Sequence, residues 1–225
     1  MSHSCPHCGH DFKKRKCNLT RHLKSSKCSS IVKMIEKKKN DVTNNDYNNI
    51  TFNQEQLDFI NEVLCDCKLI GIPGGGKTRC IIEKINQAFI KKYFVDKSNF
   101  VILTFSKKTI EDIIIKGRKT NNNFTNKNVK TLHSLAGTII SKLLKRSTNS
   151  IETIIVSAVN VLKRVTREEL KKIPVLEKLK VLFIDEAQDI SGIQYEFLML
   201  LKEKVGCFMI MIGDPNQNIY QFQDG

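Results

Sequence analysis

From residue 51 onward, short apolar runs alternate with stretches in which apolar residues recur at helical spacing. The apolar runs are typical of buried strands and cover residues 68–70, 99–105, 129–132, 181–184 and 207–212. Asn53 is a plausible cap for a helix with Gln56 on its first turn that runs to about residue 64. Further helices are predicted over residues 78–90, 106–116, 135–145 and 151–164. Strands that alternate with helices in this way form a parallel sheet with helices on its faces. We therefore expect an α/β domain over residues 51–225, with any ligand at the carboxyl ends of the strands.

Residues 1–50 lack this alternation and divide into two parts. Cysteine and histidine are concentrated in residues 1–30, which predicts a small metal-dependent unit. A short basic helix is predicted up to about residue 39, and the polar, asparagine-rich run that follows has no periodicity. We therefore expect a basic helix and flexible linker at residues 31–50.

Composition and charge narrow the class of protein. With 40% hydrophobic and 27% charged residues, the chain has an ordinary globular composition. No apolar run is long enough to span a bilayer, and the polar N-terminus does not resemble a signal peptide. We therefore expect a soluble intracellular protein without a membrane partner, in the nucleus, the cytoplasm or a viral replication compartment.

The formal net charge of +14 favours polyanionic partners. Residues 1–50 hold 11 Lys and Arg against 4 Asp and Glu, a net of +7, so half of the excess lies in this part. A codon bias towards Lys and Asn would explain some of it.

The first 30 residues carry a pattern typical of a zinc site. Cys5 and Cys8 form a Cys-x-x-Cys pair, and His22 and Cys28 follow with five residues between them. Three thiolates and one imidazole make a tetrahedral Zn²⁺ site, without which so short a segment could not bury enough surface to fold. Other ligands within reach in place of Cys28 are His7, His10 and Cys17. A segment that binds no metal is the remaining alternative.

With Phe12 and Leu19 as core residues, this stretch resembles the DNA-binding zinc finger family, with one extra residue between Cys8 and His22. Its Lys and Arg side chains would contact phosphates. The four cysteines further along are scattered and predict no disulfide framework: Cys65, Cys67, Cys80 and Cys207.

A glycine-rich motif follows the first predicted strand. Residues 71–78 read GIPGGGKT and match the phosphate-binding loop G-x-x-x-x-G-K-[ST] at every fixed position. Gly74, Gly75 and Gly76 would let backbone N–H groups converge on phosphate oxygens at the N-terminus of the next helix. Lys77 would reach the β- and γ-phosphates, and the Thr78 hydroxyl would ligate Mg²⁺. A glycine-rich turn could match by chance, but the order of strand, loop and helix favours a nucleoside triphosphate site.

Two adjacent acids follow the predicted strand at residues 181–184. Asp185 at the strand tip can hold Mg²⁺ through water, and Glu186 can polarise a water that attacks the γ-phosphate. Such a pair is common by chance after one strand. It is less so downstream of a phosphate loop in a strand–helix series.

Six motifs in order carry a resemblance to a known family. They are FNQEQ at 52–56, GIPGGGKTR at 71–79, LTFSKK at 103–108, TLHS at 131–134, DEAQD at 185–189 and GDPNQNIYQF at 213–222. Together they resemble the UvrD/Rep group of superfamily 1 DNA helicases over residues 51–225. The related helicases typified by the nonsense-mediated-decay helicase share the loop proline, but they have Leu-Pro after the glutamine where this chain has Asn218-Ile219. The resemblance implies a RecA-like P-loop NTPase fold and ATP-dependent DNA helicase activity.

The resemblance also implies residue roles in the nucleotide site. Gln56 would recognise adenine, and Arg79 would lie near the nucleotide. Asp185 and Glu186 would be the Mg²⁺ and general-base pair. Gln188 and Gln217 would sense the γ-phosphate and relay its state to the DNA face.

Single-stranded DNA, or RNA, would lie across residues whose aromatic rings stack on bases without reading the sequence. The residues implied are Thr104, Phe105, Thr131, His133, Tyr220 and Phe222. Core packing is the alternative for Phe105 and Phe222. A satisfied hydrogen bond at a strand end is the alternative for His133.

The chain departs from the family pattern in three ways. Phe222-Gln223 stands where the family usually has Trp followed by Arg, so one charge that would link nucleotide and DNA is absent. Residues 134–184 are mostly amphipathic helix, so we expect only a short remnant of the family's helical insertion. Because the chain stops at Gly225, we expect the second RecA-like domain and its arginine finger to be absent, or to act in trans.

The alternative function is a non-catalytic nucleic-acid-binding protein that binds ATP and DNA without unwinding.

Overall fold

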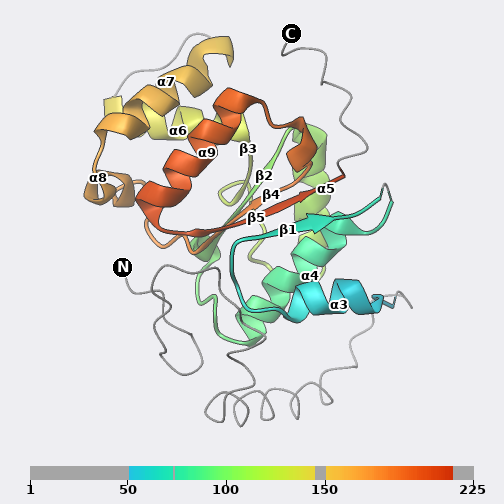
Figure 1. Cartoon of the computed structure of the whole chain (residues 1–225). Coiled ribbons are helices and arrows are strands. Elements are labelled where there is room, and N and C mark those ends of the chain that lie inside the picture. Colours follow the sequence, from blue (N-terminus) through green and yellow to red (C-terminus); the bar gives the residue numbers. More distant parts are fainter. Residues whose placement is uncertain (1–50, 73, 145–150, 215–225) are drawn as a thin grey trace, which may run out of the picture. The chain divides into compact units, whose positions relative to one another are not determined.

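The computed structural model of the chain describes residues 51–72, 74–144 and 151–214 (Figure 1). The predicted zinc ligands lie outside the described residues, as do the linker and three predicted site residues. These are Cys5, Cys8, His22 and Cys28, residues 31–50, and Gln217, Tyr220 and Phe222. The assignments made for them therefore stay predictions.

Within the described residues, five parallel strands form one sheet in the order β1-β5-β4-β2-β3. Their bounds are β1 (Cys67–Ile70), β2 (Phe100–Thr104), β3 (Val129–Thr131), β4 (Val181–Ile184) and β5 (Phe208–Gly213). Ile70 pairs with Gly213, and Leu103 pairs with Ile184, so the strands end close together along one edge. Strand β5 lies between β1 and β4. It therefore separates the strand before the glycine-rich loop from the strand before the paired acids.

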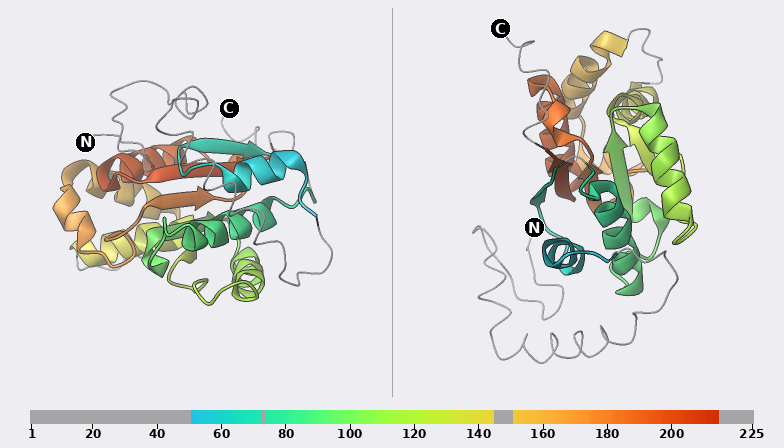
Figure 2. Two further views of the ribbon diagram at one scale, coloured as in Figure 1. Left: turned by 90° about the horizontal axis from the view of Figure 1, so that it is seen from below. Right: turned by 90° about the vertical axis from the view of Figure 1, so that its right-hand side faces the viewer.

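Helices cover both faces of this sheet (Figure 2). One face carries α3 (Gln54–Asn61), α4 (Lys77–Ile90) and α5 (Lys107–Arg118). The other carries α6 (Leu132–Leu144), α7 (Ile151–Arg164), α8 (Arg167–Lys171) and α9 (Gly192–Val205). Among the helices of the described residues, none is long and apolar enough to cross a bilayer.

Strand β2 shows why the apolar runs are continuous. Phe100 and Ile102 belong to the core on the α3, α4 and α5 face, and Val101 and Leu103 belong to the core on the opposite face. Successive side chains of a strand point to opposite faces, so a sheet covered on both sides needs apolar residues at every position. All five residues of β2 are buried.

The predicted α/β architecture is confirmed, with differences at the ends of elements. The helix predicted from an Asn53 cap to about residue 64 is α3, which Asn53 caps as predicted and which ends earlier, at Asn61. Helix α9 was not predicted, although Gly206 marks its end with a left-handed φ of 75°. Two 3₁₀ turns, Lys97–Asn99 and Ala187–Asp189, flank strands β2 and β4.

The helices within residues 134–184 pack on the sheet, and the segment ends in β4, a strand of the sheet itself. Leu135 and Ile139 of α6 are buried together with Ala158 and Leu162 of α7, in the core cluster that also contains Leu182 of β4. These helices, together with α9, therefore form one helical layer of the α/β domain. Its helices position the sheet and, with it, the strand ends that carry the site.

Candidate functional site

The glycine-rich loop connects β1 to α4 along a path that glycine permits. Gly74 and Gly76 have φ values of 71° and 75°, in the left-handed region that side chains disfavour. The Gly75 N–H donates to the Ile72 carbonyl at 3.0 Å, which closes the turn. The loop thus ends at the N-terminus of α4, a 14-residue helix. The free N–H groups of the first turn and the helix dipole favour binding of an anion there.

Lys77, the first residue of α4, turns back over this loop. Its Nζ donates to the carbonyls of Gly71 at 3.0 Å and Ile72 at 3.3 Å. The Gly71 N–H in turn donates to the Gly213 carbonyl at the end of β5, at 3.2 Å. The ammonium group is therefore held beside the loop, and its carbonyl partners are ones that a phosphate oxygen could replace.

The paired acids meet this loop through a side-chain hydrogen bond. The Thr78 hydroxyl, one residue into α4, donates to Asp185 Oδ2 at 3.3 Å. The Asp185 N–H donates to the Leu103 carbonyl at 2.9 Å, which fixes the residue just beyond β4. The predicted Mg²⁺ ligands Thr78 and Asp185 are thus brought together although they lie 107 positions apart.

Asp185 is a buried carboxyl group, with 1% of its surface exposed. Burial and the neighbouring Glu186 raise its pKa to about 6, against hydrogen bonds from the Glu186 backbone and Thr78 and the charge of Lys77. A hydroxyl oxygen next to a buried carboxylate is a donor set that suits Mg²⁺. A bound ion would also offset the negative charges of Asp185 and Glu186.

Glu186 and Gln188 link the acid turn to the end of β5. Glu186 has a φ of 55°, an uncommon conformation for a residue other than glycine. Gln188 Nε2 donates to Glu186 Oε2 at 2.8 Å, and Gln188 Oε1 accepts from the Asp214 N–H at 3.0 Å. A Cβ at Gly213 would lie 2.5 Å from Gln188 Oε1. Only glycine therefore fits beside Gln188 in this arrangement.

Gln56 and Arg79 also lie by the loop. Gln56 Nε2 donates to the Gly75 carbonyl at 2.9 Å, and Gln56 Oε1 accepts from the Asn53 N–H at 2.9 Å, which caps α3. The Arg79 guanidinium lies over the Phe52 ring, 5.1 Å from its centroid. The predicted nucleotide residues of the described part are thus gathered at one end of the sheet.

The predicted nucleic-acid residues of the described part follow β2 and β3. Thr104 is buried, with 1% exposed, and its hydroxyl donates to the Ser106 carbonyl at 3.0 Å. Thr131 Oγ1 accepts from the Ser134 N–H at 3.1 Å. Phe105 and His133 are half-buried, and Phe105 belongs to neither core cluster. Both threonine hydroxyls therefore serve local structure, and Phe105 and His133 have the surface that a strand could contact. The interface itself stays a prediction.

Lys84 is a structural residue that the sequence did not single out. It is 2% exposed, and its Nζ donates to the Phe59 and Glu62 carbonyls at the end of α3. The ammonium also lies 4.5 Å from the centroid of the Phe59 ring. Its position four residues after the buried Cys80 was the available signal, because it places Lys84 on the apolar face of α4.

A five-stranded parallel sheet between two helical layers, with a phosphate loop after β1 and paired acids after β4, defines a RecA-like P-loop fold. The sequence model of the AAA domain family matches residues 60–223, and the chain belongs to this family.

Two relatives narrow the class. The chain is 34% identical over 177 residues to a candidate ATP-dependent DNA helicase, R568, of Acanthamoeba polyphaga mimivirus; the match covers 76% of this chain and 25% of that protein. It is 39% identical over 87 residues to the RecB subunit of the RecBCD enzyme of Borreliella burgdorferi, over 37% of this chain and 7% of that protein. The chain thus spans about a quarter of the length of the first relative. Family and relatives together support a superfamily 1 helicase-like ATPase domain.

Proposed function

We propose that this chain is the ATP-binding domain of a UvrD/Rep-type ATP-dependent DNA helicase, and that it couples ATP hydrolysis to the binding of single-stranded DNA. The hydrogen bond from Thr78 to Asp185 carries the proposal, because it joins the helix after the glycine-rich loop to the paired acids. The AAA domain match and the two relatives support a helicase-like ATPase. The sequence GDPNQNIYQF at residues 213–222 favours the UvrD/Rep group within that class.

ATP would bind with its phosphates at the N-terminus of α4. Backbone N–H groups of the loop would donate to the phosphate oxygens, and Lys77 would exchange the carbonyls of Gly71 and Ile72 for phosphate. Gln56 keeps one N–H and one lone pair beyond its present bonds to Gly75 and Asn53. These remaining groups could bind the adenine edge, and this would make the site selective for adenine nucleotides.

Thr78 and Asp185 would hold Mg²⁺, as their oxygen ligands favour this cation. When bound, the ion neutralises charge on the phosphate oxygens during transfer. Glu186 would orient the attacking water and accept its proton, and Gln188 would hold the Glu186 carboxylate in place. An arginine from a second RecA-like domain would stabilise the charge that develops on the γ-phosphoryl group.

Nucleic acid would cross the ends of β2 and β3, where Phe105 and His133 keep exposed surface. Gln188 is bonded to the Asp214 N–H, and Asp214 precedes Gln217 in the motif at residues 213–222. A movement of the Glu186 side chain on hydrolysis would therefore shift Gln188 and, through its hydrogen bond to Asp214, the motif at residues 213–222. The predicted zinc finger at residues 1–30 would add a sequence-independent contact with phosphates.

Steady-state ATP hydrolysis, measured with and without single-stranded DNA and with a matching second RecA-like domain, tests this function. We expect residues 1–225 alone to hydrolyse ATP at a rate near background. The arginine finger expected from the second RecA-like domain contributes about 10³ to 10⁵ in rate, and it is not present in that assay. Adding the second domain and DNA should raise the rate, and Glu186→Gln should remove the gain. DNA-stimulated turnover that survives Glu186→Gln would contradict the proposed base. Tight ATP and DNA binding without turnover under every condition would instead identify a non-catalytic binding protein.

A further inference from the structure

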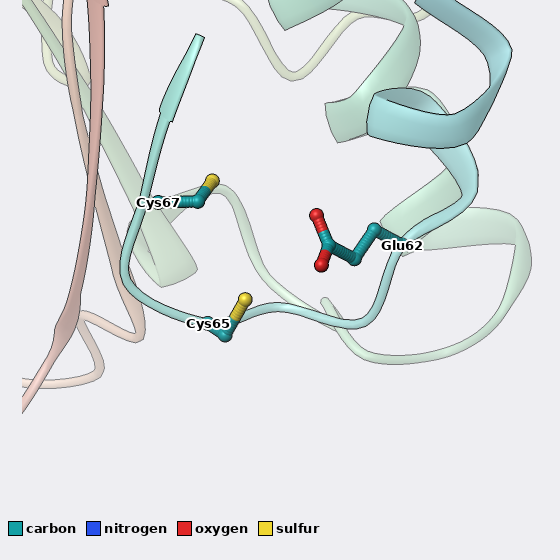
Figure 3. Close-up of side chains that lie close together, drawn as sticks. All are labelled: Glu62, Cys65 and Cys67. Atoms are coloured by element: carbon teal, nitrogen blue, oxygen red, sulfur yellow. The ribbon is translucent and has the colours of Figure 1, made fainter. Parts of the chain in front are cut away.

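A second group of ligating side chains lies away from the nucleotide site, in the segment that joins α3 to β1 (Figure 3). Glu62 directly follows α3, Cys65 lies in the connection, and Cys67 is the first residue of β1. Figure 3 shows the two thiols and the carboxylate turned towards a shared space. One ligand atom of each residue lies within 4.8 Å of those of the other two. The positions of Cys65 and Cys67 in the sequence had not predicted this group.

The chemistry of these three groups selects a thiophilic cation. Two thiolates and a carboxylate are ligands that Zn²⁺ accepts in tetrahedral sites, whereas Mg²⁺ and Ca²⁺ take oxygen alone. Ligand atoms around a tetrahedral Zn²⁺ are separated by about 3.5–3.8 Å, so the side chains would need to approach one another by at most about 1 Å. Cys65 and Cys67 are half-buried and Glu62 is exposed. A cation could therefore enter from solvent and bind thiols that the fold partly shields.

Lys84 completes the charge balance around the group. Its Nζ is already held by the carbonyls of Phe59 and Glu62, so it contributes charge without being a ligand. Two thiolates, one carboxylate, one ammonium and one Zn²⁺ sum to zero. A loaded site would thus carry no net charge at this partly buried position.

We propose that Glu62, Cys65 and Cys67 bind one Zn²⁺ ion, with water as the fourth ligand. Each thiol that becomes a ligand releases its proton to solvent as its sulfur–zinc bond forms. The ion fastens the end of α3 to the start of β1. These two elements carry Gln56 at one end and lead into the glycine-rich loop at the other. The site is distinct from the predicted finger at residues 1–30 and needs no nucleotide.

Zinc content of the full chain, measured under a phosphine reductant after removal of loosely bound metal, tests the proposal. Cys65→Ser with Cys67→Ser should bind about one equivalent less than the unchanged chain, whatever residues 1–30 bind. Cys207→Ala, which removes a buried thiol elsewhere, should keep the full content. Co²⁺ loading should give thiolate charge-transfer absorption in the unchanged chain and in Cys207→Ala. This absorption should be weaker in the double variant.

Glu62→Gln provides a second measurement, because this exposed residue can change with little effect on folding. We expect Glu62→Gln to weaken zinc binding. In a separate measurement, added Zn²⁺ should raise the melting temperatures of the unchanged chain and of Cys207→Ala. The melting temperature of the Cys65→Ser, Cys67→Ser double variant should rise less. Equal zinc content in the chain and the folded double variant, or an equal loss in Cys207→Ala, would overturn the site. Neither result would affect ATP binding, so this inference and the proposed function fail separately.

Discussion

At the scale of single residues, Asp185 combines the cost of a buried charge with the chemistry expected of a metal ligand. It is 1% exposed, and its pKa is raised to about 6, chiefly by burial. A carboxyl group with a folded-state pKa above its unfolded value binds a proton more readily in the folded protein. The ionised group therefore destabilises the metal-free fold, fully above about pH 6 and progressively less as the pH falls towards 3.8.

We predict that Asp185→Asn stabilises the metal-free protein at neutral pH while weakening Mg²⁺·ATP binding. Removing the charge should raise the free energy of unfolding by roughly 1–3 kcal/mol at pH 7.5. Urea unfolding with a chelator present measures this difference, which should shrink as the pH falls through 6. The less buried Asp189→Asn is the control and should gain less. A loss of stability in Asp185→Asn at pH 7.5 would contradict the buried-charge account.

Gly213 leads to a second prediction at this scale. An added Cβ would lie 2.5 Å from Gln188 Oε1 and 3.1 Å from the Ala187 nitrogen, so Gly213→Ala must displace Gln188 or the strand end. We expect a loss of stability of about 1–3 kcal/mol. The proposed coupling of Glu186 to β5 should also be impaired, so that DNA-stimulated hydrolysis falls more than ATP affinity.

Gly192→Ala is the control, because a Cβ there meets nothing within 4 Å. Chemical unfolding and ATP hydrolysis with the second domain present would measure both effects. If Gly213→Ala behaved like Gly192→Ala in both assays, the contact between Gly213 and Gln188 would have no functional weight.

At the scale of elements, helix α3 is positioned by its cap and by its bond to the loop. Asn53 Oδ1 accepts from the Gln56 N–H at 2.9 Å, and the Gln56 side chain accepts from the Asn53 N–H in return. The same Gln56 side chain donates to Gly75. The cap therefore orients the side chain expected to recognise adenine.

We predict that Asn53→Ala lowers stability by about 0.5–2 kcal/mol, the usual cost of a lost N-cap, and weakens binding of ATP. Asn53→Asp keeps an acceptor at the cap and should retain both properties. Thermal unfolding and nucleotide titration of the two variants would test this. Equal ATP affinity in all three proteins would show that the cap does not orient Gln56 for binding.

The elements also show what the sequence could and could not predict. Apolar runs predicted the five strands of the described residues. The runs are continuous in β2 and β4, which are buried at every position because helices cover both faces of the sheet, and they are interrupted by Lys68 and Lys130 in the edge strands β1 and β3. The motif GIPGGGKT predicted a glycine-rich loop followed by a helix, and α4 begins at Lys77 directly after Gly76. The burial of Thr104 and the hydrogen bond from the Asp214 N–H to Gln188 Oε1 depend on packing between segments that are distant in the sequence, which no spacing encodes. The approach of Glu62 to Cys65 and Cys67 depends on the turn after α3, and Cys-x-Cys alone did not reveal it.

At the scale of the whole chain, charge is unevenly distributed, because half of the net +14 comes from residues 1–50. We predict that DNA binding is insensitive to sequence and strongly dependent on salt. Deleting residues 1–50 should flatten the slope of log K against log salt, as fewer phosphates are neutralised. Fluorescence anisotropy with two unrelated single strands measures both properties. An unchanged slope would place the phosphate contacts in residues 51–225.

We propose above all that the glycine-rich loop, Lys77, Thr78 and Asp185 form one site for ATP and Mg²⁺. Isothermal titration of the chain with ATP, with and without Mg²⁺, tests it most directly, using Lys77→Ala as the site variant and the exposed Lys116→Ala on α5 as the control for lost charge. We predict Mg²⁺-dependent binding of one ATP that Lys77→Ala abolishes and Lys116→Ala leaves unchanged. ATP binding that survives Lys77→Ala, or that does not depend on Mg²⁺, would contradict it.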